Sequence, residues 1–218
     1  MKTVLKIITT TLFTVTLFSC SSDESAKTLE IVNIDATNYV IAGKVLNNHV
    51  AVVTFSSNDK VIIKSIEEEV EADYTVHGDT IKIENYGYVK IQNNAIVAFE
   101  NGEINFDQVH LLQKTSDNAF KGKYFTGPVK LLSGSGVEQI FHVRFSAPGA
   151  LYGYGESFDM AFPDNEFELI ANVAGKYQQE GYSTVFYILN DKLICEIRTN
   201  QFGSPIYFYS DELMEQEQ

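Results

Sequence analysis

The chain has 218 residues, with 16 Lys or Arg against 29 Asp or Glu and a formal net charge of −13 at pH 7. Nucleic-acid binding needs clustered cations facing phosphates, so an acidic chain with no basic cluster is not expected to bind nucleic acid. The sequence contains no cofactor-binding or metal-binding motif, so we expect neither a cofactor nor a metal site.

The N-terminus has the pattern of a signal peptide. Lys2 and Lys6 precede an apolar stretch that ends at Phe18, and this stretch is shorter than the ~20 residues that a spanning helix needs. It ends in Leu17-Phe18-Ser19-Cys20, which is similar to the lipobox of bacterial lipoproteins. The resemblance implies that residues 1–19 are removed and that Cys20 carries lipid. The alternative is an ordinary secretory signal that leaves Cys20 as a plain thiol.

The segment after Cys20 is polar and contains too little apolar surface to fold by itself. We expect residues 20–36 to form the lipidated N-terminus and a tether. The serines and acidic residues directly after Cys20 also resemble the surface-export signals of Bacteroidota lipoproteins. This resemblance implies an outer-membrane location, on either the periplasmic face or the cell surface, with the membrane as a partner through the lipid.

Short apolar or alternating runs separated by Gly, Asn and Asp then predict a first antiparallel β unit at 37–114. The expected strands are Leu29–Ile34, Val40–Leu46, Val50–Ser56, Val61–Ser65, Asp73–Val76, Thr80–Glu84, Tyr88–Gln92, Ala95–Phe99 and Val109–Leu112. A four-residue period over Val61–Val70 also fits a short helix, but the β-branched start of this stretch favours a strand followed by an acidic loop.

A polar spacer, Thr115–Asn118, precedes a second β unit at 118–212. Its expected strands are Phe120–Phe125, Gln139–Ser146, Tyr152–Phe158, Glu166–Ala171, Lys176–Gln178, Ser183–Leu189, Lys192–Arg198 and Ile206–Tyr209. The predicted fold class is therefore all-β, an antiparallel meander that forms two related small β-barrels or half-barrels after a signal peptide and tether.

Three pairs of similar stretches indicate that the second unit repeats the first. They are Gly43-Lys44 with Gly122-Lys123, the stretch at 52–57 with that at 142–147, and the stretch at 91–97 with that at 188–194. The distance between partners grows along the chain, as loop insertions in the second copy would cause. Chance similarity between turn-rich β segments is the alternative.

The first unit also resembles the small lipocalin-like, calycin-type domains of Bacteroidota lipoproteins. The resemblance lies in the hairpin Tyr74-Thr75-Val76-His77-Gly78-Asp79-Thr80-Ile81-Lys82-Ile83 and the Asn93-Asn94 turn that follows it. The tryptophan that commonly opens such domains is absent, and Val45 and Tyr124 stand at the corresponding places. The function of this family is unknown. The resemblance therefore implies a meander fold and gives no information about activity.

Aromatic side chains in the second unit are the candidate binding residues. Tyr152, Tyr154 and Phe158 recur at even spacing in a glycine-rich strand, and Tyr182 and Tyr187 follow. Tyrosine suits binding faces because its ring is apolar and its tip is polar. Packing and cross-strand pairing are the alternative roles for these rings.

No catalytic residue is proposed from the sequence. Cys195 alternates with Leu193 and Ile197, which predicts a buried, inert thiol. Two acidic runs, at 67–73 and 159–168, lack a calcium-loop spacing and are interpreted as solvated charge. The sequence thus favours a membrane-anchored, non-enzymatic binding or adaptor lipoprotein with an unknown protein or small-molecule partner. The alternatives are a lipocalin-type carrier of a small apolar ligand and a hydrolase whose site is assembled only in the fold.

Overall fold

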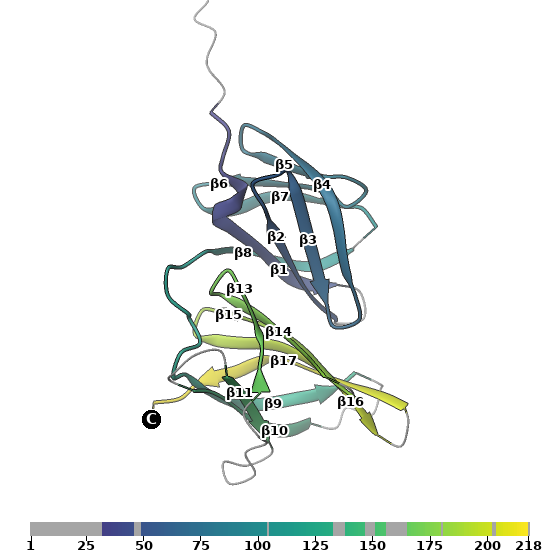
Figure 1. Ribbon diagram of the computed structural model, residues 1–218, viewed down its shortest axis with the longest axis vertical. Helices are drawn as coiled ribbons and strands as arrows, with labels where there is room; N and C mark the ends of the chain where they lie inside the picture. The colour runs from purple at the N-terminus through teal and green to yellow at the C-terminus, as the bar shows by residue number, and fades with distance from the viewer. Residues whose placement is uncertain are drawn as a thin grey trace, which may run out of the picture. The chain divides into compact units, whose positions relative to one another are not determined.

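The computed structural model describes residues 32–45, 49–103, 105–132, 138–146, 151–155, 165–179, 181–201 and 204–217, with backbone alone for 151–155, 165 and 201. Residues Ile31–Gln218 form one compact unit, and Figure 1 traces its strands. Among the described residues, none belongs to a helix with the length and apolar character required to span a bilayer.

The first sheet follows a short 3-10 helix, η1 (Ala36–Asn38), and its strands lie side by side in chain order. They are β1 (Tyr39–Val45), β2 (His49–Phe55), β3 (Lys60–Ser65), β4 (Glu69–His77), β5 (Thr80–Ile83), β6 (Gly87–Gln92), β7 (Ala95–Asn101) and β8 (Phe106–Gln113). The last strand, β8, pairs antiparallel with the first, β1. The sheet is therefore closed except between β7 and β8, which are its two edges.

The second sheet repeats this order. Its strands are β9 (Tyr124–Leu131), β10 (Glu138–Phe145), β11 (Leu151–Gly155), β12 (Asn165–Glu166), β13 (Glu168–Ile170), β14 (Ala174–Gln179), β15 (Tyr182–Leu189), β16 (Lys192–Gln201) and β17 (Ser204–Glu215). The last strand, β17, pairs with the first, β9. Phe167 alone separates β12, which pairs with β11, from β13, which pairs with β14. Counted as one interrupted strand, the two give this sheet eight positions, like the 8-stranded first sheet.

The predicted fold class is confirmed: the described chain is all-β and antiparallel, and each sheet curls until its last strand meets its first. Closure of this kind follows from strand chemistry. One face of each strand is apolar and must be covered, and paired edges are protected from aggregation.

Two of the three predicted repeat stretches occupy equivalent places. Residues 52–55 and 142–145 of the first of these pairs lie in the second strand of each sheet, β2 and β10. Those at 91–97 and 188–194 form the hairpin between the sixth and seventh positions. Both hairpins turn through two residues with positive φ, at 52° and 57° for Asn93 and Asn94 and at 51° and 62° for Asn190 and Asp191. Such turns match the twist of the strands that they connect.

The predicted pairing of Gly43-Lys44 with Gly122-Lys123 is wrong, because Gly43 lies inside β1 whereas Gly122 precedes β9. The structural counterpart of Gly43 is Gly127. Gly43 pairs with Ala51 of β2 and Gly127 with Phe141 of β10, and the alignment of the second strands places these two partners together. Each glycine lies where the first strand crosses the last. A Cβ on Gly43 would lie 2.1 Å from the Gln108 oxygen, and one on Gly127 would lie 2.5 Å from the Glu212 oxygen.

The strands predicted at 29–34 and 120–125 differ most from the structure. The described part of Leu29–Ile34, from Val32 on, is irregular. The strand predicted at Phe120–Phe125 instead runs from Tyr124 to Leu131. Gly127-Pro128 suggests a strand end, since proline cannot donate to a ladder. Here the register of β17 shifts between Tyr209 and Met214, opposite Pro128, and Ser210 Oγ donates to the Pro128 carbonyl (2.6 Å).

Three apolar clusters hold the structure together. The inner faces of the first sheet form an aliphatic core that includes Ile41, Val53, Ile63 and Ile81. The second sheet is filled mainly by phenylalanine rings. Six of these rings are buried: Phe120, Phe125, Phe141, Phe145, Phe167 and Phe186. The third cluster, which we call the inter-sheet core, joins residues of β1, β2 and β8 to residues of β13–β17.

Substituting Gly127 with Ala tests the crossing of first and last strands. The added methyl group would overlap the backbone of β17, so we expect a loss of about 1–3 kcal/mol in the free energy of unfolding, measured by chemical denaturation. The same loss is expected for Gly43→Ala. Thr75→Ala, at an exposed position of β4, is the control and should change stability by less than about 0.5 kcal/mol. Neutral glycine substitutions would contradict the close crossing.

Candidate functional site

The sequence-predicted site residues do not converge in one place. Cys20 and Phe158 lie outside the described residues, and Tyr152 and Tyr154 lie on β11, where the structure describes only the backbone. Tyr182 is half-buried and packs against the phenylalanine core. Tyr187 is 1% exposed and belongs to the inter-sheet core, so its ring contributes packing there. The binding role assigned to this set stays a prediction.

Cys195 is buried beside Leu193 and Ile197 in the phenylalanine core, as the alternation of β16 predicts. Burial, with the nearby Glu196 carboxyl, raises the pKa of its thiol to about 12. The thiol is therefore protonated at physiological pH and has little nucleophilic character.

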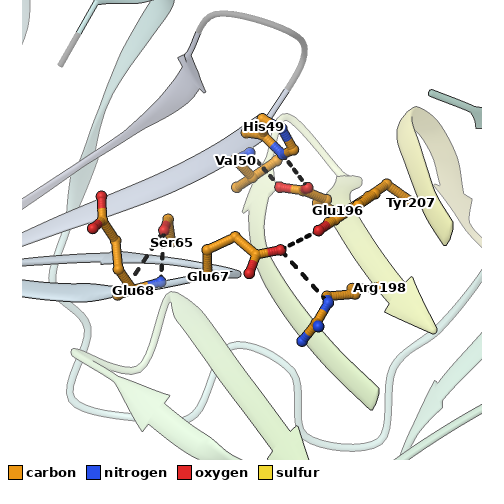
Figure 2. A network of polar contacts seen from close by, with 8 residues as sticks. All are labelled: His49, Val50, Ser65, Glu67, Glu68, Glu196, Arg198 and Tyr207. Carbon is orange, nitrogen blue, oxygen red and sulfur yellow. Dashed lines mark hydrogen bonds and ion pairs between the residues drawn. The ribbon is translucent and has the colours of Figure 1, made fainter. Parts of the chain in front are cut away.

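The polar contacts of greatest chemical interest surround the inter-sheet core, and Figure 2 shows one group of them. At its centre is Glu196 of β16, whose side chain is 0% exposed. The backbone N–H of Val50 donates to Glu196 Oε2 (2.7 Å), and Nδ1 of His49 contacts Oε1. A carboxyl group of the second sheet thus accepts from one backbone N–H and contacts one imidazole nitrogen at the start of β2 in the first sheet.

Burial raises the pKa of Glu196, although the Val50 N–H and His49 oppose this by stabilising the carboxylate. The contact also fixes the orientation of the His49 ring, which lies edge-on to Tyr207 at a centroid distance of 5.5 Å. The His49 side chain is 32% exposed. Among the described residues, no hydroxyl or thiol is hydrogen-bonded to its Nε2 atom.

Beside this pair, Glu67 of the β3–β4 loop reaches two residues of the second sheet. The hydroxyl of Tyr207 donates to Glu67 Oε1, and Arg198 Nε lies 3.5 Å from the same oxygen (Figure 2). The loop itself is held by the Glu68 N–H, which donates to Ser65 Oγ (3.1 Å). Because Glu67 and Arg198 are partly exposed, their ion pair adds little stability and mainly fixes orientation.

Two lysines lie at the same junction. Lys64 of β3 is 8% exposed at its side chain and donates to Glu69 (2.9 Å) and to Glu168 of the second sheet (2.6 Å). Burial by itself would lower the pKa of Lys64, but the hydrogen bonds to the two carboxylates raise it. For Lys176 of β14, burial lowers the pKa, and its Nζ reaches the Glu68 carbonyl at 3.5 Å.

These charged side chains mostly pair with one another, and their contacts hold the two sheets together. The described residues contain no group of three or more His, Cys, Asp and Glu side chains placed to hold a metal ion. No sequence signal could have paired His49 with Glu196. In the sequence, Glu196 alternates with apolar residues of β16, and this pattern predicts a solvent-facing side chain. In the structure, the outer face of β16 packs against β2 and covers Glu196.

The described surface also has hollows, and one of them is lined by Lys64 and Glu168. A small hollow in the core of the first sheet has a volume of about 20 Å³, and Phe99 of β7 and Phe106 and Val109 of β8 are among its lining residues. Two larger hollows are open to solvent. One, of about 560 Å³, lies near η1 and β4, and the other, of about 350 Å³, lies between β2–β3 and residues Glu168–Asn172.

Comparisons with known proteins identify no relative of this chain. No family model matches it, no curated protein is significantly similar in sequence, and no solved structure is significantly similar in fold.

The pH dependence of stability tests the buried carboxyl. Since the pKa of Glu196 is raised in the folded state, its contribution to stability is fully present below the unfolded pKa and is lost as pH rises through the folded pKa. Glutamine keeps an acceptor for Val50 and cannot ionise. We therefore expect Glu196→Gln to gain stability relative to the parent chain as pH rises from about 4 to 8, measured by urea unfolding across this range.

Glu196→Ala is the matched disruptive variant. It leaves the Val50 N–H without its acceptor in a buried position, which we expect to cost about 1–3 kcal/mol at all these pH values. A Glu196→Gln variant whose stability relative to the parent chain is constant with pH would contradict the assigned pKa direction.

Proposed function

We propose that this chain is a membrane-anchored, non-enzymatic binding or adaptor lipoprotein that meets its partner on its surface. The observation that carries the proposal is the dense packing of the described side chains inside both sheets. Ligand-carrying pockets measure roughly 300–1,000 Å³, whereas the hollow in the first core measures about 20 Å³. The interior of the second sheet is packed with buried phenylalanine rings in edge-on and tilted contacts.

The filled cores weigh against the lipocalin-type carrier. To accept an apolar ligand, either sheet would have to displace side chains that already pack densely, and repacking of this kind typically costs a few kcal/mol. The hydrolase alternative lacks support from the His49–Glu196 pair, which is engaged in joining the two sheets.

The anchor and the outer-membrane location rest on the sequence around Cys20. A cysteine with several acyl chains would hold the protein firmly at a membrane, since each buried methylene contributes about 0.8 kcal/mol. The polar segment that follows would then separate the β sheets from the lipid headgroups. Both the periplasmic face and the cell surface are compatible with this anchor.

The absence of a carried ligand is testable by native mass spectrometry of the purified protein. We expect the mass of the chain with its covalent lipid and no further apolar molecule. As a positive control, a lipid-binding protein treated in the same way should retain its ligand. A stoichiometric non-covalent lipid would favour the carrier function instead.

The anchor is tested by mass spectrometry of the protein from the membrane fraction. We expect a diacylglyceryl modification on Cys20 and a Cys20→Ser variant that is found in the soluble fraction. An unmodified Cys20 in membrane-bound protein would rule out lipid anchoring.

A further inference from the structure

The first sheet has one unpaired boundary, between β7 and β8, which we call the β7–β8 seam. Among the described strands, β7 pairs only with β6, and β8 pairs only with β1. The backbone edges that these two strands turn toward each other therefore have no strand partner. Unpaired strand edges are templates on which a further extended chain can add.

Side chains bridge the seam at both ends. At the loop end, the Asn101 amide accepts from the Phe106 N–H (3.0 Å) and donates to the Phe106 carbonyl (3.2 Å). At the other end, the hydroxyl of Tyr39, at the start of β1, donates to Asn94 in the β6–β7 turn (2.9 Å). These contacts fix the ends of the two strands, and the middle of the seam is left without a ladder.

The side chains along β7 are unusually apolar for a sheet edge. Val97 is 51% exposed and Phe99 is 40% exposed. Edges that must remain unpaired are commonly protected by lysine, proline or a covering loop. No lysine, arginine or proline occurs between Ile91 and Gln113, so the sequence lacks this chemical protection.

The charge of the seam has one sign. The segment 91–113 carries three acidic residues, Glu100, Glu103 and Asp107, and all three are exposed. A second copy of this chain, with its net charge of −13, would be repelled by such a surface. The charge instead complements a cationic segment.

Resting on the proposed function, we propose that the β7–β8 seam binds an extended cationic peptide segment of a partner protein by strand addition. Backbone hydrogen bonds to the edge of β7 would supply affinity. Alternate apolar side chains of the segment would cover Val97 and Phe99, and its lysine or arginine residues would face Glu100 and Asp107. The hollow behind the seam is too small to take more than a small side-chain tip, so the segment would lie along the edge.

A synthetic peptide of alternating lysine and valine is the probe, and the purified full chain is the target. We expect fluorescence anisotropy to show binding that is about tenfold tighter than for a glutamate–valine peptide and that weakens as salt is raised. Hydrogen exchange should slow at β7 and β8 in the complex and stay unchanged in β10 and β14–β17.

Substitutions locate the binding edge. Val97→Lys places a like charge on the edge and should weaken binding of the probe about tenfold. Ile140→Lys, at an equally exposed apolar position of β10 (55%), is the matched control and should leave binding unchanged. If Val97→Lys does not fold, the double variant Glu100→Gln/Asp107→Asn serves the same purpose and should also weaken binding.

The proposal is overturned by failure of the lysine–valine peptide to bind, by equal binding of the two peptides, by protection outside β7 and β8, or by insensitivity to the substitutions on the seam. Salt-dependent self-association of the chain through β7 would also overturn it, in favour of a second copy. Any of these outcomes leaves the proposed surface-binding function standing if no non-covalent lipid is found, so the two failures are distinguishable.

Discussion

The structure depends on the packing of the outer faces of two curled sheets against each other. Val50 and Val52 of β2 meet Val185 and Tyr187 of β15 in the inter-sheet core, and each is fully or almost fully buried. Burying a side chain of this size contributes about 1.5–3 kcal/mol. Residues that would face solvent in an isolated barrel are thereby part of a core, and the two sheets belong to one compact unit.

That packing explains the unusual polar contacts. Once the outer face of β16 is covered, Glu196 has no access to water, and a buried polar group is stable only when it is hydrogen-bonded. The Val50 N–H and His49 supply the partners. Glu67 and Lys64 add further links at the margin of the same core, where directional contacts fix the register between the sheets.

The interior of the sheets and the boundary of the first sheet differ in their chemistry. Among the described residues, mainly aliphatic side chains pack inside the first sheet and phenylalanine rings pack inside the second. Curling pairs the first and last strands of each sheet and leaves the first sheet a single unpaired boundary. Exposed apolar side chains and acidic residues meet there, and the proposed strand addition is argued from these two properties.

The sequence by itself determined the all-β class, most strand positions and the buried state of Cys195, because alternation and turn chemistry are local. It also indicated the repeat, although Gly122 was paired with Gly43 in place of Gly127, since the register of a strand crossing cannot be seen in spacing. Only the tertiary structure decided that Tyr187 and Glu196 are buried and that β7 and β8 stay unpaired. These properties arise from contacts between residues far apart in sequence, which no local pattern encodes.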